Sequence, residues 1–251
     1  MRGRPVEDRF WEIDLIRGLL VLGMATYHAF FDLHALRGWA DPAAGPLLAL
    51  ARSVAFGFVL LAGAALYLSF LRQEIKGRPP PLSRSLARGS RIFGWGMLVT
   101  LATWIYPREG FVIFGVLHLI GISIVLCRPF LGLPQTSLLV GTAAVAIGAA
   151  LDGLPGGSPW LIPLGLPPAG FYSLDYLPIL PWTGVFLIGT SAAAWAYPGY
   201  RRRFRLPAWA GRLPETRPGR CLIWLGQHSL AAYLLHQPAL ACLILLLIPS
   251  S

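Results

Sequence analysis

The sequence predicts an all-α fold, a polytopic helical bundle in a membrane, and three observations lead to this prediction. The 251 residues are 55% hydrophobic and 13% charged, against a charged fraction of about 25% in soluble proteins. The apolar residues gather in stretches that are long enough to cross a bilayer. Lys and Arg are concentrated between alternate stretches, as in the loops on one side of a membrane.

Seven stretches approach the roughly 20 mostly apolar residues that a spanning helix needs. They lack the alternation of barrel strands, and no long polar insertion separates them, so we expect one transmembrane domain over residues 1–251. The first stretch continues past Arg17 without a small-x-small cleavage site, which predicts an uncleaved span rather than a signal peptide. The predicted spans are residues 12–36, 46–71, 88–106, 112–131, 135–151, 177–197 and 221–248.

The later spans differ in the polar residues that they carry. The second span holds Arg52, and only His118 interrupts the fourth. The fifth is short and rich in Ala and Gly, which predicts close packing against its neighbours. Asp175 and Trp182 flank the start of the sixth span, and the seventh contains His236.

The basic residues predict the orientation of the chain. Seventeen of the 21 Lys and Arg fall on one side of the seven spans, whereas only Arg37 and Arg108 fall on the other. The positive-inside rule then places the N-terminus in the cytoplasm and the C-terminus outside. The net charge of +10 therefore serves mainly to orient the protein, and we expect a lipid bilayer rather than a nucleic acid as its partner.

The cysteines provide no evidence for a disulfide framework or a metal site. The chain has three of them, at Cys127, Cys221 and Cys242, and no two have the spacing of a metal-binding knuckle. The His residues also lack the spacing of a zinc site, so we expect no metal.

The first span carries four ionisable residues on one face. At about 100° per residue, Asp14, Arg17, His28 and Asp32 fall within a stripe about 60° wide. Ionisable groups are costly at membrane depth, so each must pair or have a function. His28 lies about 16 Å beyond Arg17 along the helix, in the outer half of the membrane. Asp32, one turn further, is placed to orient His28 and raise its basicity, which makes His28 a candidate general base.

Residues of other spans reach the same outer level. His118 comes early in the fourth span, and Asp175 and Trp182 lie at the outer rim of the sixth. In the seventh span His236, followed by Gln237, lies in the outer half. We therefore expect these five residues to line a site with His28.

Several polar residues have a structural explanation beside the functional one. Arg52 could pair with Asp32 across helices, and Asp14 could pair with Arg17 at the i,i+3 spacing. An isolated histidine such as His118 is more often a hydrogen-bonded core residue than a catalyst. The residues that we assign to either role are Asp14, Arg52, His228 and Ser229.

Four segments resemble, in the same order, a bacterial family related to the heparan-α-glucosaminide N-acetyltransferase catalytic domain. In the first segment, Arg17 is followed by ten residues and then His28, a signature similar to that of the acyltransferase-3 family. The resemblance covers residues 9 to about 240. The segments are EIDLIRGL at 12–19, FGVLHLIG at 114–121, LDYLPILPW at 174–182, and LGQHSL with YLLHQP between 225 and 238.

The resemblance implies a membrane-embedded acyltransferase of the bacterial inner membrane and cell envelope. Such an enzyme takes an acyl group, usually acetyl, from cytosolic acetyl-CoA or another acyl-CoA. It passes the group to a hydroxyl or amine of a glycan or small molecule at the extracytoplasmic face. His28 would be the general base, with Asp32 beside it, and Arg17 would lie near the thioester or hold the first helix. Whether the protein is a homo-oligomer is left open.

Two other classes of function are compatible with the residues alone. A proton-coupled small-solute transporter would use intramembrane His and Asp as a proton relay, although the chain shows no inverted repeat. A membrane scaffold without activity would have no use for the ionisable stripe.

Overall fold

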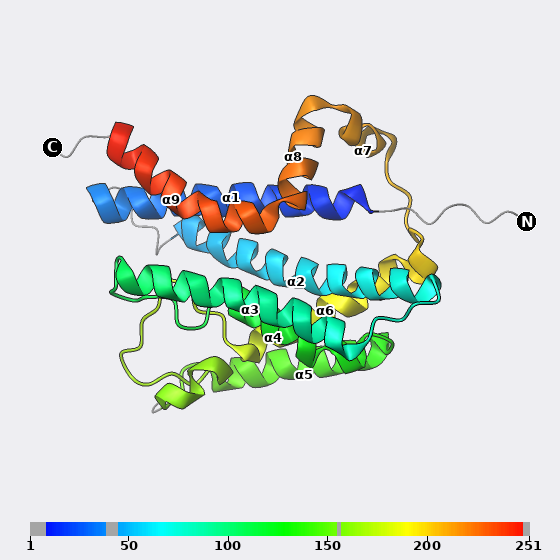
Figure 1. Ribbon diagram of the computed structural model, residues 1–251, viewed down its shortest axis with the longest axis horizontal. Helices are drawn as coiled ribbons and strands as arrows, with labels where there is room; N and C mark the ends of the chain where they lie inside the picture. The colour runs from blue at the N-terminus through cyan, green and yellow to red at the C-terminus, as the bar shows by residue number, and fades with distance from the viewer. Residues whose placement is uncertain (1–8, 39–44, 155–156, 248–251) are drawn as a thin grey trace, which may run out of the picture. The chain divides into compact units, whose positions relative to one another are not determined.

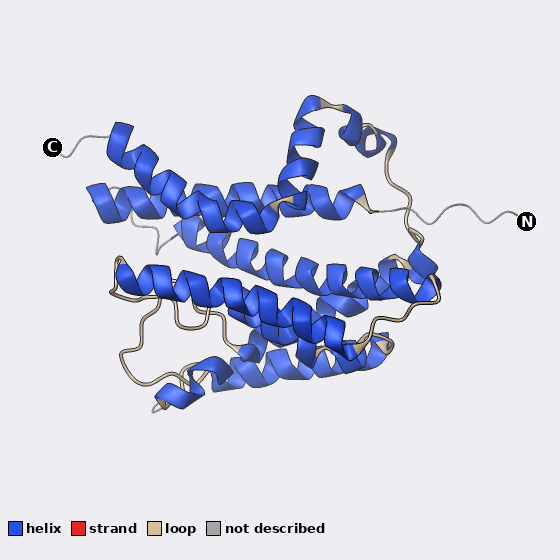
Figure 2. Ribbon diagram, viewed as in Figure 1, coloured by secondary structure: helices blue, strands red, loops and turns tan. Residues whose placement is uncertain are grey.

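The computed structural model describes residues 9–38, 45–154 and 157–247, and its regular secondary structure there is helical (Figure 2). One isolated bridge, between Phe114 and Tyr176, is the only strand-like pairing in these ranges. The all-α prediction is therefore confirmed for the described residues. Arg2 and Arg4 of the basic N-terminus, and Ile248 at the end of the last predicted span, lie outside them.

The chain divides into two compact units, and each is described by itself. The first comprises Met1–Phe58 and Arg205–Ser251, and the second comprises Val59–Phe204. The single transmembrane domain expected from the sequence stays a prediction. The helices of the first unit are α1 (Trp11–Arg37), the first part of α2 (Gly45–Ile75), α7 (Ala208–Gly211), α8 (Arg217–Gln227) and α9 (Ser229–Leu247).

In the first unit α1 packs against both α8 and α9 (Figure 1). α9 runs beside α1, whereas α8 stands steeply to both. The backbones of α1 and α8 meet at two glycines. A Cβ on Gly18 would strike the carbonyl of Leu222, and a Cβ on Gly226 would strike the carbonyl of Asp14. Only glycine at both positions allows this close approach.

The last predicted span, residues 221–248, is two helices rather than one. Thr216 caps the start of α8 by accepting a hydrogen bond from the Gly219 N–H at 3.1 Å, so α8 begins well before Cys221. The helix ends at Gln227, where His228 leaves the helical conformation with φ −103° and ψ 20°. The spanning helix therefore begins at Ser229. The sequence suggested one span because the apolar residues 221–225 at the end of α8 lead almost directly into the apolar α9.

The second unit contains the rest of α2 and four further helices joined by short 3₁₀ segments. α5 and α6 pack closely, since a Cβ on Gly141 would lie 2.9 Å from the carbonyl oxygen of Gly184. The close packing expected of the fifth span is confirmed. The helices are α3 (Leu82–Ile105), α4 (Val116–Leu126), α5 (Pro134–Leu151) and α6 (Ile179–Ala196).

Five helices of the described chain are long and apolar enough to cross a membrane, so the chain has the helices of an integral membrane protein. The expected span 112–131 is shorter than predicted, because α4 has 11 residues and rises only about 16 Å. The expected span 88–106 lies in α3, whose first half carries Arg84, Arg88 and Arg91. The count of seven and the cytoplasmic N-terminus stay predictions. The five helices are Trp11–Leu36, Gly45–Ile75, Pro134–Leu151, Ile179–Ala196 and Ser229–Leu247.

The contact between α1 and α8 yields a stability prediction. Replacing Gly18 with Ala places a methyl group on the Leu222 carbonyl, and we expect a loss of about 1–3 kcal/mol, typical of overpacking. Gly94→Ala is the matched control, because nothing lies within 4 Å of its Cβ position. Thermal unfolding in a mild detergent measures both variants. Equal stability of the Gly18→Ala variant and the wild-type protein would contradict this packing.

Candidate functional site

The candidate site lies where α9 passes the C-terminal half of α1, within the first unit. The rings of His28 on α1 and His236 on α9 stand edge to face, with their centroids 4.7 Å apart. One residue further along α9, the Gln237 amide reaches the carboxylate of Asp32. Four of the residues predicted to form a site are thus in contact across two helices.

An apolar layer supports these polar residues. Val21 and Met24 of α1 and Val54 of α2 are almost fully buried, and Tyr233 of α9 packs against them. Met24 and Tyr233 also supply backbone carbonyls to the two imidazole rings. The packing therefore fixes the acceptors that orient both histidines.

The hydrogen bonds define the protonation pattern of both imidazoles. His28 Nδ1 lies 2.9 Å from the Met24 carbonyl oxygen, and His236 Nδ1 lies 2.7 Å from that of Tyr233. A carbonyl oxygen only accepts hydrogen bonds, so each Nδ1 carries the proton and donates it. In the neutral rings Nε2 keeps its lone pair. Each ring therefore presents a basic nitrogen, as a general base requires.

Asp32 has a different partner from the one that its sequence position suggests. Its Oδ1 accepts a hydrogen bond from Gln237 Nε2 at 2.6 Å, and the side chain is buried. No hydrogen bond joins Asp32 to His28, which Met24 orients instead. Arg52 is exposed and forms no ion pair with Asp32, so that alternative is wrong.

Three buried acceptor atoms at this site have no hydrogen-bond partner: Asp32 Oδ2, His236 Nε2 and Gln237 Oε1. The Gln237 amide is oriented without ambiguity, since its Nε2 must face the carboxylate. Burying a polar atom without a partner costs about 1–3 kcal/mol. Three unpaired acceptors on these neighbouring residues therefore suit a ligand that brings hydrogen-bond donors.

A second polar cluster surrounds Asp14 near the other end of α1. The Asp14 carboxylate is 3% exposed and accepts a hydrogen bond from Arg17 Nη1 at 3.1 Å. Arg9 Nε lies 3.2 Å from Asp14 Oδ2, and Gln227 Nε2 donates to the same oxygen at 3.4 Å. The predicted i,i+3 pair is therefore formed. Gln227 joins this cluster, at the start of α1, to the end of α8. The donor-binding role of Arg17 stays a prediction.

His118 is held among residues of the second unit. Its ring is 1% exposed, and Nδ1 accepts a hydrogen bond from the Gly115 N–H at 3.2 Å. Nε2 therefore carries the proton and donates to Thr100 Oγ1 at 3.4 Å, because that hydroxyl already donates to the Val112 carbonyl at 2.7 Å. Both ring nitrogens are occupied at the start of α4. The alternative of a hydrogen-bonded core histidine fits His118.

Asp175 holds the same helix start. Its Oδ2 accepts a hydrogen bond from the Val116 N–H at 2.9 Å, which satisfies a free amide in the first turn of α4. Its neighbour Tyr176 donates its hydroxyl to the Ile162 carbonyl at 2.7 Å, and burial raises the pKa of Tyr176 to about 12. These contacts tie the loop before α6 to α4 and to the 3₁₀ segment Pro159–Leu164.

The other predicted residues lie apart from these contacts. Trp182 is half-buried in the first turn of α6. His228 is exposed at the end of α8, where its Nδ1 donates to the Trp224 carbonyl at 2.8 Å. Ser229 is the first residue of α9. No group of three His, Cys, Asp or Glu that could hold a metal occurs among the described residues.

Two residues of the clusters were absent from the sequence-based site. Arg9 and Gln227 hold Asp14, yet Arg9 counted only as a topogenic charge and Gln227 only as part of a motif. The place of Gln227, one residue before the break at His228, could have suggested its role at a helix end.

One family model matches the chain. It describes heparan-alpha-glucosaminide N-acetyltransferase, catalytic, and covers residues 9–238. Neither a curated protein nor a solved structure gives a significant match. The matched region includes both polar clusters of α1 and the residues around His118.

Because both ring nitrogens of His118 already form hydrogen bonds within the protein, we predict a structural role for this residue. Because His118→Ala removes the acceptor of the Gly115 N–H and leaves a cavity, we expect a loss of about 2–4 kcal/mol in stability. Turnover per folded molecule should stay within about twofold of wild type. His228→Ala, at an exposed helix end, is the control and should change neither quantity. A stable His118→Ala protein without activity would instead make His118 a site residue.

Proposed function

The chain belongs to the heparan-alpha-glucosaminide N-acetyltransferase catalytic family, and we propose that it is a membrane acetyltransferase with its site at His28. In this proposal the donor is cytosolic acetyl-CoA, or another acyl-CoA. The acceptor is a hydroxyl or amine of a glycan or small molecule at the extracytoplasmic face. The family supports the class of reaction, and the geometry of α1 and α9 supports the residues.

One observation carries the choice of acceptor. The unpaired atoms beside His28 are all acceptors, Asp32 Oδ2, His236 Nε2 and Gln237 Oε1. Hydroxyls and amines are hydrogen-bond donors, and they are also the nucleophiles of acyl transfer. A sugar or amino sugar satisfies several such acceptors at once. Bound this way, one donor group would lie next to the lone pair of His28 Nε2.

The reaction follows from that arrangement. His28 Nε2 takes the proton from the acceptor hydroxyl or amine as its oxygen or nitrogen attacks the thioester carbonyl carbon. The tetrahedral intermediate collapses, the C–S bond breaks, and the imidazolium returns the proton to the leaving thiolate. Asp32 and Gln237 hold the acceptor, and the His236 ring packs edge to face against the His28 ring. The net change is transfer of one acetyl group, with free CoA released.

The pair of imidazoles also favours a second function. Rings 4.7 Å apart could relay protons in a solute transporter. Purified protein with radiolabelled acetyl-CoA and a panel of hexoses and hexosamines separates the two functions. Labelled product and CoA release support transfer. Their absence, together with proton-driven solute uptake into proteoliposomes, supports transport and contradicts the proposal.

The role of His28 is tested by substitution. We expect His28→Ala to lower the turnover number by about 10²–10⁴-fold, the usual contribution of a general base. The matched control is His34→Ala, an exposed histidine on the same helix, which should keep activity within about twofold. CoA release and thermal unfolding are measured on both variants. Full activity in a folded His28→Ala protein would rule out the assignment.

The role of Gln237 is tested by comparing two similar residues. Gln237→Leu removes the donor to Asp32 and one unpaired acceptor, so we expect the KM for the acceptor to rise about tenfold. The KM for acetyl-CoA should not change. Gln227→Leu removes a comparable contact with Asp14 and should lower stability without changing either KM. The same change in both variants would show that Gln237 is only structural.

A further inference from the structure

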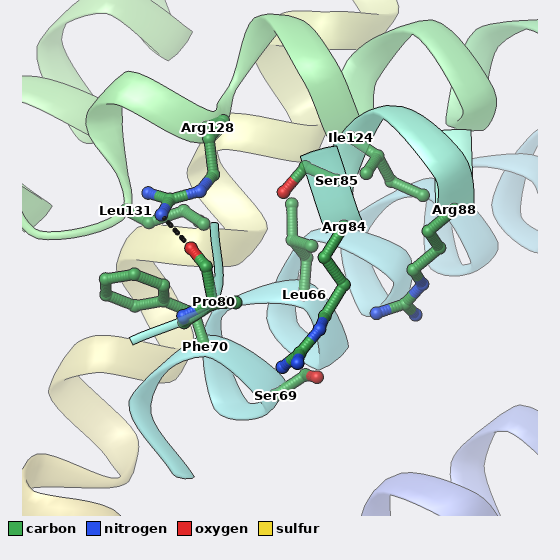
Figure 3. A pocket seen from close by; sticks show the side chains of 10 residues that line it. All are labelled: Leu66, Ser69, Phe70, Pro80, Arg84, Ser85, Arg88, Ile124, Arg128 and Leu131. Atoms are coloured by element: carbon green, nitrogen blue, oxygen red, sulfur yellow. Dashed lines mark hydrogen bonds between the residues drawn. The ribbon is translucent and has the colours of Figure 1, made fainter. Parts of the chain in front are cut away.

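A small pocket in the second unit is lined by three arginines that come from two different elements (Figure 3). Arg84 and Arg88 project from α3, and Arg128 projects from the 3₁₀ segment Arg128–Phe130. Ser69 and Phe70 of α2 also line the pocket. The positive-inside rule explains why these loops and helix ends are basic. It does not explain why three arginines from two elements line the same pocket.

The positive charge of the pocket has no counter-charge among its lining residues. No Asp or Glu lines it. An anion that binds there would supply the missing counter-charge.

Arg128 is held in place but keeps one donor unused. Its Nη2 donates to the Pro80 carbonyl at 2.7 Å, and its guanidinium carbon lies 4.9 Å from the centre of the Phe70 ring. These contacts fix the plane of the group. Its Nε is buried and has no hydrogen-bond partner. A preorganised guanidinium with a free donor suits an oxyanion.

We propose that this arginine pocket binds a phosphate group. Guanidinium groups donate paired hydrogen bonds that match phosphate oxygens. The pocket also lies at the start of α3, whose first turn adds partial positive charge. The remaining wall is apolar, with Leu66, Ile124 and Leu131, so the phosphate belongs to a molecule with an apolar or flexible body.

Two sources supply such a group. One is the headgroup of an anionic phospholipid, since the pocket belongs to the side that the sequence predicts to be cytoplasmic. The other is the phosphates of CoA, and only this source rests on the proposed function. The two share one chemistry, a phosphate anion bound at the arginine pocket.

Binding of two probes to the full chain tests the proposal. The first probe is adenosine 3′,5′-bisphosphate, measured by calorimetry in an uncharged detergent. The second is phosphatidylglycerol in nanodiscs, with phosphatidylcholine as the reference, measured by native mass spectrometry. We expect the Arg84→Gln/Arg88→Gln double variant to bind at least one probe about tenfold more weakly or worse. Arg91→Gln removes a charge from the same helix without lining the pocket and should bind normally.

The outcomes separate the sources. If the double variant loses affinity only for adenosine 3′,5′-bisphosphate, the ligand of the pocket is CoA. If it loses affinity only for phosphatidylglycerol, the ligand is a phospholipid headgroup. If the wild-type protein binds neither probe, or if Arg91→Gln loses as much affinity as the double variant, the proposal is wrong. His28→Ala should bind both probes normally even where acetyl transfer is lost. Failure of the proposed function therefore cannot be mistaken for failure of the pocket.

Discussion

The close approach of α8 to α1 is the constraint on which the candidate site depends. At Gly18 and Gly226 the two backbones touch with no side chain between them, and Gln227 then reaches Asp14. This contact fixes the end of α8, and α9 begins at Ser229, two residues later. His236 follows about 10 Å along α9. Two glycines and one amide thus determine which face of α9 meets His28.

The hydrogen bonds of His118, His28 and His236 distinguish these residues more clearly than their burial does. His118 is almost fully buried, and both of its nitrogens are occupied, so nothing is left for a substrate. His28 and His236 each use Nδ1 on a backbone carbonyl, which leaves Nε2 as a base. Water cannot satisfy polar atoms in a lipid interior, so unpaired ones there require a reason. Substrate binding is such a reason.

Local features of this fold could be predicted from the sequence, because they depend on one helix at a time. Helical periodicity placed Asp14, Arg17, His28 and Asp32 on one face of α1, and the Asp14–Arg17 pair is formed as its spacing indicated. The adjacent His236 and Gln237 meet that face. The catalytic roles of His28 and Asp32 stay predictions.

Apart from the contact of His236 and Gln237 with α1, features that depend on neighbouring helices could not be predicted. Membrane depth placed His118 beside His28, but depth does not say which helices touch, and its hydrogen-bond partners come from the second unit. Average hydropathy over residues 221–248 conceals the break at His228. A count of basic residues also cannot show that Arg84, Arg88 and Arg128 share a pocket.

The two proposed sites differ in charge, as the proposed acceptor and a phosphate-bearing ligand would require. Around His28 lie a carboxylate and neutral acceptors, which suit a hydroxyl or amine and would repel a phosphate. The arginine pocket has the opposite character and would repel an ammonium group. A guanidinium beside His28 would also disfavour the imidazolium that forms during proton transfer. The Met24 carbonyl and the ring of His236, both in contact with His28, carry no positive charge that would oppose proton uptake.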